Sequence, residues 1–276
     1  MEQHLARLTT TVPISRLPTS SCSLSADAAA AGGVSAVESP IDIDTARVIT
    51  PDPWGRSIDL WGYDTPSQTV TMTYHGRPSC DRRHAMEDVR GEFSTRNRID
   101  FGGREYELKN IHYHAVSEHN VDGVQLDGEA HLLHETVHTP TPARPRKLLV
   151  LAVRLTMSAT NGSQHDALLA NGTGAQALPS ETCATPMSAV RPDIIVRDLL
   201  PPPGSAWWYR GSLTTKANGD ADYHKPVDWI VFQETMAVDW AVWEHYRSIW
   251  PLRDFPNRNA KPATNASPIV TAISVC

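Results

Sequence analysis

Cysteine is scarce in this chain: four residues, Cys22, Cys80, Cys183 and Cys276, are spread over 276 positions. None of them belongs to a C-x-x-C pair, the spacing that is typical of a thiolate zinc site. Their wide separation gives no sign of a disulfide framework either. The cysteines therefore argue against a closed structural zinc site, and we expect no disulfide scaffold.

Long apolar runs and runs of like charge are missing as well. No segment reaches the roughly 18 consecutive apolar residues that a membrane span requires, so we expect no transmembrane helix. The formal net charge is -6 and no five like charges follow one another. Because phosphate binding needs a basic stripe, nucleic acid is excluded as an expected partner.

The N-terminal segment, residues 1–37, lacks both periodicity and the apolar h-region of a secretory signal. Its Ala, Ser and Thr content is typical of a flexible segment, and we expect a flexible leader or targeting segment there. Sequons at Asn161, Asn171 and Asn265 would suit a secreted protein, although sequons often arise by chance. The compartment therefore stays open, with organelle and cytoplasm as alternatives. We expect residues 38–276 to form one domain.

Helical patterns are few. The clearest is "DWAVWEHYRSIW", in which Asp239 can cap the start and Trp240, Trp243 and Tyr246 recur at helical spacing. Strand patterns are more frequent: "QTVTMTY" and "PVDWIVFQ" alternate, and "KLLVLAVRL" is a continuous apolar run that indicates a buried central strand. Two stretches, residues 157–195 and 216–226, are expected to be irregular. The sequence thus predicts a single, mainly β domain with few helices.

Histidine, by contrast, is concentrated in "NIHYHAVSEHNVDGVQLDGEAHLLHE", residues 110–135, which holds five of the twelve histidines. The first part reads as a strand. Side chains alternate along a strand, so Asn110, His112 and His114 share one face while the apolar residues between them share the other. Two imidazoles on one face lie close enough to hold one ion.

The segment "GEAHLLHE" follows the same rule. It places Glu129, His131 and Leu133 on one face and His134 on the opposite face. If the two segments pair as antiparallel neighbours, His131 can come opposite the histidines of the first strand. Three neutral imidazoles that converge on one point make a catalytic zinc site whose fourth position is open to water.

Hydrogen-bond partners for the ligands are also present. Zinc-bound histidines donate their other N–H to a carboxylate, amide or carbonyl. Asn110 precedes His112 by two residues, and Glu129 precedes His131 by two. Spacing alone leaves two interpretations open: a metal site, or histidines that are satisfied by packing and hydrogen bonds.

A resemblance narrows this choice. "HYHAVSEHNVDG" followed by "EAHLLH" resembles the signature of the alpha-class carbonic anhydrases, of the form H-x-H, S-E-H, G, E-x-H-L-x-H, with an interval similar to the bacterial members. "ESPIDID", "WYRGSLTT", "VDWIV" and "NRNAKPATN" resemble further family motifs in the same order, so the match covers about residues 38 to 265. The resemblance implies a large, mostly antiparallel twisted central sheet with a few short helices. It also implies zinc-dependent reversible hydration of carbon dioxide to bicarbonate and a proton.

By this resemblance the zinc ligands would be His112, His114 and His131, with Asn110 and Glu129 as their hydrogen-bond partners. The family usually has Gln where Asn110 stands.

Further roles follow from the same resemblance. Glu118 and Thr214 would form a hydrogen-bonded gate beside the metal, although a contact of this kind is also compatible with strand packing. Structural roles would fall to His119, His134, Tyr209 and Ser212. The pocket for carbon dioxide would be formed by Leu133, Val150, Leu213 and Trp229, each of which is also an ordinary core residue type. His84, in "RRHAMEDV", would be the proton shuttle, with a plain surface histidine as the alternative and His75 as a weaker rival.

Besides Asn110, two longer segments depart from the family pattern. The family's N-terminal W-G-Y segment has no counterpart before "ESPIDID", since "LWGYDTPS" comes after that motif. "KANGDADYHKP" replaces the usual Pro-Pro after Thr215 and adds about five residues. The rival functions are a carbonic anhydrase-like binding protein without catalysis, and a zinc hydrolase on another fold. The second would require H-E-x-x-H or a similar motif, which does not occur.

Overall fold

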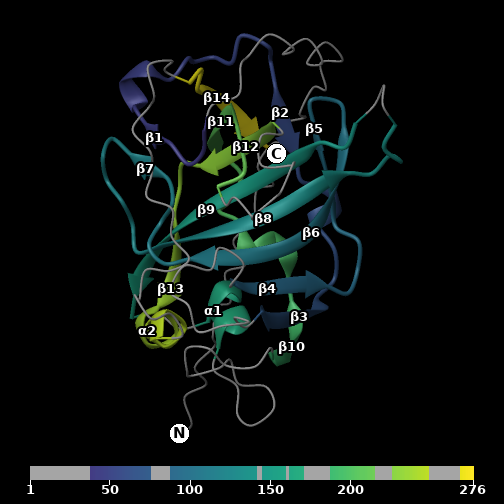
Figure 1. Ribbon diagram of the computed structural model, residues 1–276, viewed down its shortest axis with the longest axis vertical. Helices are drawn as coiled ribbons and strands as arrows, with labels where there is room; N and C mark the ends of the chain where they lie inside the picture. Colours follow the sequence, from purple (N-terminus) through teal and green to yellow (C-terminus); the bar gives the residue numbers. More distant parts are fainter. Residues whose placement is uncertain are drawn as a thin grey trace, which may run out of the picture.

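The computed structural model describes residues 38–75, 88–141, 145–159, 162–170, 187–214, 226–248 and 268–276. Within these residues β-strands predominate and helices are few and short (Figure 1). The predicted mainly β, single-domain fold is therefore confirmed. The expected leader over residues 1–37 lies outside the described residues.

The strands are, in chain order, β1 (Asp42–Ile43), β2 (Ser57–Asp59), β3 (Gln68–His75), β4 (Asp88–Phe93), β5 (Arg98–Phe101), β6 (Glu105–His114), β7 (Asn120–Val121), β8 (Gly128–Thr136), β9 (Leu148–Ser158), β10 (Met187–Ile194), β11 (Ser205–Gly211), β12 (Val227–Phe232), β13 (Met236–Asp239) and β14 (Thr271–Val275). The helices are α1 (Gln164–Leu169) and α2 (Trp240–Ser248), with 3-10 turns η2 (Thr45–Arg47), η3 (Trp61–Tyr63) and η5 (Val196–Leu199). No helix among the described residues has the length and apolar character needed to cross a membrane.

Among the described residues, twelve strands form one sheet, and most of its pairs are antiparallel. Its path runs β10-β3-β4-β6-β5-β2-β14-β11-β12-β9-β13, and β8 lies between β6 and β9. The parallel exceptions in this sheet are β9 with β12, β9 with β13, and β14 with β2. Strands β1 and β7 form a separate parallel pair. The long strands β6, β8 and β9 lie side by side through the middle of the molecule, as Figure 1 shows.

Apolar side chains cover both faces of this sheet. We call the face that carries Val150, Trp229 and Tyr209 the front face, and these residues belong to its core cluster. The rear face carries a larger cluster that includes Ile111 and Leu132. Fully burying one such apolar side chain stabilises a fold by roughly 1.5–3 kcal/mol, so both faces hold the strands in register.

A β-bulge in β6 decides which face the histidines occupy. Leu108 pairs with His134 and Asn110 pairs with Leu133, so Lys109 is an extra residue in the ladder. Leu108 and Ile111 therefore both point to the rear core, although they are three residues apart. From Asn110 onward the even-numbered residues face the front. A sequence pattern with strict alternation would not have located this change of parity.

Helix α2 begins as the sequence predicted. The side chain of Asp239 accepts hydrogen bonds from the backbone N–H of Ala241 at 2.9 Å and of Val242 at 3.3 Å, which satisfies two groups that a helix start leaves open. Trp243 and Tyr246 are buried. Trp240, however, is 55% exposed, so only part of the predicted aromatic stripe packs against the core.

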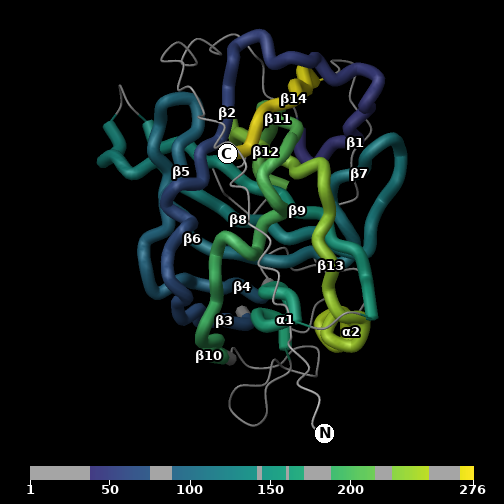
Figure 2. The backbone as a smooth tube through the Cα atoms, turned by 180° about the vertical axis from the view of Figure 1, so that it is seen from behind, coloured from purple at the N-terminus to yellow at the C-terminus, as the bar shows by residue number. Residues whose placement is uncertain are grey.

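The stretch that was expected to be irregular, residues 157–195, contains ordered elements, and this expectation was wrong. Ser163 and Asp166 form a capping box at the start of α1, and α1 buries Leu168 and Leu169. Strand β10 pairs with β3 at one edge of the sheet. Figures 1 and 2 show α1 and α2 at the same end of the molecule. The short length of α1 hid it, because six residues carry too little periodicity to be recognised.

The C-terminal residue corrects another expectation. Cys276 is disulfide-bonded, whereas the cysteine spacing gave no sign of a disulfide. The other three cysteines lie outside the described residues. Cysteines that are distant in sequence reveal their pairing only through the fold, so composition could not have predicted it.

Candidate metal centre

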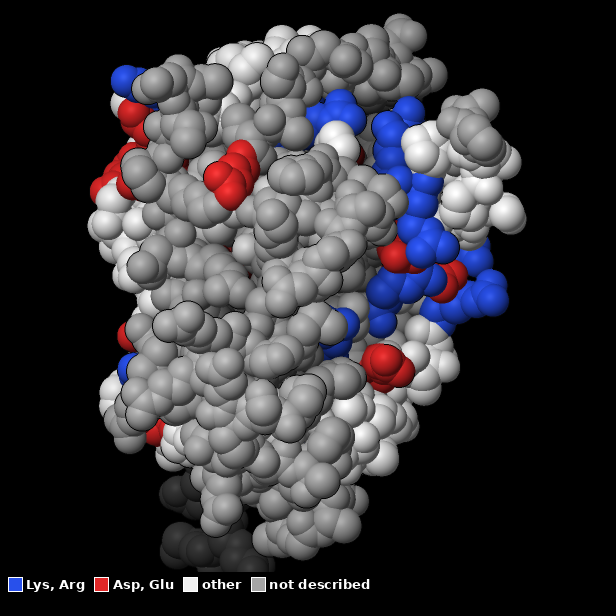
Figure 3. Space-filling model, in the orientation of Figure 1, with Lys and Arg blue, Asp and Glu red and all other residues white. Residues whose placement is uncertain are grey.

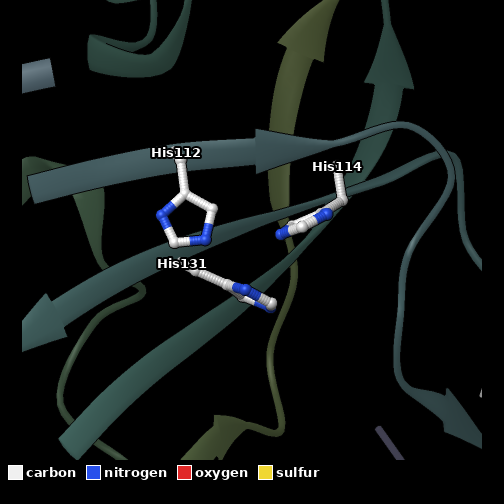
Figure 4. Close-up of side chains that lie close together, drawn as sticks. All are labelled: His112, His114 and His131. Atoms are coloured by element: carbon white, nitrogen blue, oxygen red, sulfur yellow. The ribbon is translucent and has the colours of Figure 1, made fainter. Parts of the chain in front are cut away.

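Three histidines from two neighbouring strands of the front face come together. His112 of β6 lies directly opposite His131 of β8, and His114 lies opposite Glu129. The ring centroids are 5.2 Å apart for His112 and His114, 5.3 Å for His112 and His131, and 4.4 Å for His114 and His131. One ring nitrogen from each histidine lies within 4.8 Å of the other two. Figure 4 shows the three rings turned toward a common space.

Neighbouring side chains fix the orientation of two of these rings. Asn110 Oδ1 lies 3.0 Å from His112 Nδ1, so His112 presents Nε2 to the common space. Glu129 Oε1 lies 2.7 Å from His131 Nε2, so His131 presents Nδ1. These two partners are the ones that the sequence indicated. Their effect is to hold each imidazole in the tautomer whose other nitrogen can accept a metal ion.

Burial keeps His131 neutral. Burial lowers the pKa of His131, and the hydrogen bond and charge of Glu129 oppose this shift without cancelling it. His114 and His131 are buried, while His112 is half-buried. A neutral imidazole is the form that binds a metal ion, so the environment favours ligation.

Glu129 is the centre of a buried hydrogen-bond network. Its carboxylate accepts the backbone N–H of His119 at 2.9 Å, and its Oε1 lies 2.6 Å from His119 Nδ1 as well as 2.7 Å from His131 Nε2. Burial alone raises the pKa of Glu129. The charge and hydrogen bond of His119, together with the hydrogen bond of His131, outweigh burial and hold this pKa well below its ordinary value. Glu129 is therefore an anion that aims two histidines at once.

The network continues away from the triad through Tyr209. Tyr209 Oη lies 2.7 Å from His119 Nε2 and 2.9 Å from Ser39 Oγ. Ser39 Oγ in turn accepts the backbone N–H of Ser212 at 3.1 Å. His119, Tyr209 and Ser212 were all predicted as structural residues. Ser39 was not singled out, although it stands inside "ESPIDID", and that motif was the signal that could have found it.

The structure places Glu118 beside the triad, whereas the position of Thr214 beside it stays a prediction. Glu118 is fully buried; its Oε1 lies 3.5 Å from His114 Nδ1, and its Oε2 lies 3.9 Å from His131 Nδ1. Thr214 is half-buried and follows the end of β11 by three residues. The hydrogen bond between Thr214 and Glu118 stays a prediction.

The four predicted pocket residues gather in one apolar patch of the front face. Leu133, Val150 and Trp229 are consecutive partners across β8, β9 and β12, in the row next to His131. Leu213 packs against the same cluster. The indole of Trp229 stands edge-on to the His131 ring at a centroid distance of 4.9 Å. An apolar wall therefore adjoins the histidine triad.

The other predicted histidines lie elsewhere. His134 points to the rear, as strand alternation predicted, and its Nε2 lies 2.5 Å from Tyr63 Oη, where burial lowers its pKa to about 3. Tyr63 belongs to "LWGYDTPS", so this tyrosine faces away from the triad. His84 lies outside the described residues, and the side chain of His75 does too.

A second group with suitable donor atoms overlaps the first. His119, Glu129 and His131 also lie within 4.8 Å of one another. The short distances from Glu129 Oε1 to His119 Nδ1 and His131 Nε2 show that these two nitrogens already hydrogen-bond to the carboxylate. The set of His112, His114 and His131 is thus the one whose nitrogens fit a metal ion.

Comparisons with known proteins agree with this geometry. A family model described as eukaryotic-type carbonic anhydrase matches residues 27–258. A Caenorhabditis elegans protein provisionally named carbonic anhydrase 3 is 26% identical over 238 residues, which cover 83% of this chain and 86% of the worm protein. The solved alpha-carbonic anhydrase of Photobacterium profundum is 22% identical with a TM-score of 0.59, and the match covers 89% of this chain and 92% of the bacterial one. Dioscorin, solved in complex with ascorbate, is 18% identical with a TM-score of 0.60, and the match covers 87% of each chain. At such low identity the solved structures show a shared fold.

Proposed function

Because the chain belongs to the eukaryotic-type carbonic anhydrase family, we propose that it catalyses the zinc-dependent, reversible hydration of carbon dioxide to bicarbonate and a proton. The observation that carries this proposal is the convergence of His112, His114 and His131, whose ring nitrogens lie within 4.8 Å of one another. A catalytically weak or inactive relative would be expected to lack at least one of these histidines, and all three are present.

The donor set fits zinc. Three imidazoles without thiolates are typical of a catalytic zinc site that keeps one coordination position open. Zn²⁺ bound there would lower the pKa of water to about 7 and so make a nucleophile available near neutrality. The partners Asn110 and Glu129 would hold the rings of His112 and His131 in the orientation that zinc needs.

Glu118 and Thr214 would orient the reacting water. The Glu118 carboxylate lies beside two of the three histidine rings. We propose that the Thr214 hydroxyl donates a hydrogen bond to Glu118, so that the Thr214 oxygen can act only as an acceptor toward the water. A water that donates to this oxygen has its lone pair turned toward the substrate carbon, and fixed orientation of this kind lowers the activation barrier.

The apolar wall would receive the substrate. Carbon dioxide has no net charge and no strong hydrogen-bonding group, so an apolar surface is the environment that suits it. Val150 and Trp229 are buried in the front-face cluster, and Leu133 and Leu213 pack against it. For export of the released proton, His84 remains the candidate from the sequence, since an imidazole near its ordinary pKa transfers protons at neutral pH.

The rival proposal is a carbonic anhydrase-like protein that binds a small molecule without catalysis. Dioscorin, whose solved structure contains ascorbate, has the same fold, which makes this a concrete alternative. The two proposals differ in one respect: only the enzyme requires a metal ion for its activity.

Stopped-flow measurement of carbon dioxide hydration on zinc-loaded protein tests the proposal. The variant His131→Ala removes one ligand of the triad, and His138→Ala is a matched control beyond the end of β8. We expect wild type and His138→Ala to hydrate carbon dioxide at similar rates, and His131→Ala to lose most of this activity. Equal rates for wild type and His131→Ala, or purified wild type without zinc, would defeat the enzyme proposal.

A further inference from the structure

Arg90 lies next to the histidine triad on the front face. In the ladder of β4 and β6, Arg90 is directly opposite His112. Its neighbours on β4, Val89 and Gly91, are buried on the rear side, so Arg90 shares the face of His112. Residues directly opposite each other in a sheet have their Cβ atoms about 4.5–5.5 Å apart. A permanent positive charge is therefore attached within one strand spacing of a predicted metal ligand.

The register shows that the site has two unlike sides. In the row that contains the pair of His112 and His131, the next residues toward β12 are Ala152 and Val231, both buried and apolar. In the opposite direction the next residue is Arg90, followed by a threonine of β3. One side of the triad therefore suits a neutral molecule and the other suits an anion.

The other charged side chains that lie on this face occupy different positions in the ladder from Arg90. Glu92 is on the same face of β4, two residues further along, opposite Thr71 of β3. On β5 and β6, Arg98 pairs with Glu105 at 2.7 Å and Lys109 pairs with Glu107 at 2.7 Å. Figure 3 shows Lys and Arg gathered with interspersed Asp and Glu on the side where Figure 1 places β5 and β6.

From this geometry we infer that Arg90 is a specificity-determining residue that holds a small monovalent anion beside the triad, namely bicarbonate in the proposed reaction. The inference rests on the proposed function and adds to it a distinct place for the charged reactant. Carbon dioxide would lie against the apolar wall, while the guanidinium attracts bicarbonate. Arginine suits this task because its planar group matches the geometry of a carboxylate-like oxyanion and never loses its charge.

The effect of Arg90 on anion affinity has an expected size. Arg90 is exposed. Between unit charges at an exposed site, within the Debye length of about 8 Å, the attraction changes a dissociation constant roughly threefold to fivefold. Neutral ligands should not sense this charge.

The test measures binding rather than turnover. Cobalt-substituted protein is titrated with sodium bicarbonate and, separately, with sodium thiocyanate, and the visible spectrum of the cobalt reports the dissociation constant. Imidazole, neutral at pH 8.5, serves as the uncharged probe. Arg90→Gln is compared with Arg98→Gln, which removes the same charge from the same face about 15 Å further along the sheet.

We expect Arg90→Gln to raise the dissociation constants of bicarbonate and thiocyanate about threefold to fivefold and to leave that of imidazole unchanged. Anion binding to this variant should also depend much less on salt concentration than anion binding to wild type. Arg98→Gln should leave all three constants within error of wild type. Equal anion affinities in wild type and Arg90→Gln, or an equal loss in Arg98→Gln, would overturn the inference. Failure of the proposed function looks different: the wild type would then take up no cobalt or hydrate no carbon dioxide.

Discussion

Replacing Glu129 by Gln tests the network that aims the triad. The change keeps the size of the side chain and removes its charge. The carboxylate of Glu129 has three donors around it: the backbone N–H of His119, the His119 ring and the His131 ring. An amide has one acceptor oxygen and one donor nitrogen, so it cannot accept from both sides.

Either orientation of the new amide causes a loss. If its oxygen faces the two rings, the buried N–H of His119 meets an NH₂ group, at a cost of about 1–3 kcal/mol. If its nitrogen faces the rings, His131 must carry its proton on Nδ1, and this nitrogen can then no longer bind a metal. Each hydrogen bond to a charged acceptor also becomes a neutral one, a difference of about 1 kcal/mol. We expect the free energy of unfolding of the metal-free protein to fall by about 3 kcal/mol.

Two measurements check this prediction. Urea unfolding of metal-free Glu129→Gln gives the stability, and competition with a chelator gives the zinc dissociation constant, which we expect to rise tenfold to a hundredfold. Glu135→Gln is the control, because Glu135 lies on the same strand and pairs with Arg146 instead. Unchanged zinc affinity and unchanged stability in Glu129→Gln would refute the orienting role.

Three further predictions concern the scaffold. Burial lowers the pKa of His134 to about 3 and of His165 to about 4, so between pH 6.5 and these values only the unfolded chain binds their protons. Urea unfolding at pH 7.5 and pH 5 should show that the free energy of unfolding is roughly 4 kcal/mol lower at pH 5. In His165→Gln this decrease should be about half as large. An equal decrease in wild type and His165→Gln would count against assigning half of the effect to His165. A Cβ at Gly128 would overlap the buried ring of Trp243, so Gly128→Ala should lower the free energy of unfolding by about 1–3 kcal/mol, and unchanged denaturation curves would exclude this packing. Reduction of the disulfide at Cys276 should cost wild type about 2–4 kcal/mol of stability and so lower its melting temperature. The melting temperature of Cys276→Ser should not change on reduction.

Much of the site could be predicted from the sequence because successive side chains of a strand point to opposite faces of the sheet. The period placed His112 and His114 on one face and His134 on the opposite face of its strand, and the structure has both arrangements. The sequence alone does not show that the two segments pair, and the antiparallel ladder between β6 and β8 shows that they do. Local spacing was sufficient here because the ligands lie on adjacent strands.

Long-range contacts could not be predicted in the same way. Arg90 faces His112 because β4 pairs with β6, and nothing in the spacing between residues 90 and 112 indicates that register. The bulge at Lys109 likewise changes the parity of β6 without a glycine or proline to signal it. Such features depend on which strands become neighbours, and a single sequence does not encode this information in any local pattern.

The central claim is that three imidazoles share one zinc ion with one position open. X-ray absorption at the zinc edge of the purified protein measures this directly. We predict one zinc per chain with three imidazole nitrogens and one oxygen at about 2.0–2.1 Å, and the loss of this signal in His112→Ala. Sulfur neighbours at about 2.3 Å, four imidazoles around the metal, or zinc retained in His112→Ala with its ligand set unchanged would contradict the account.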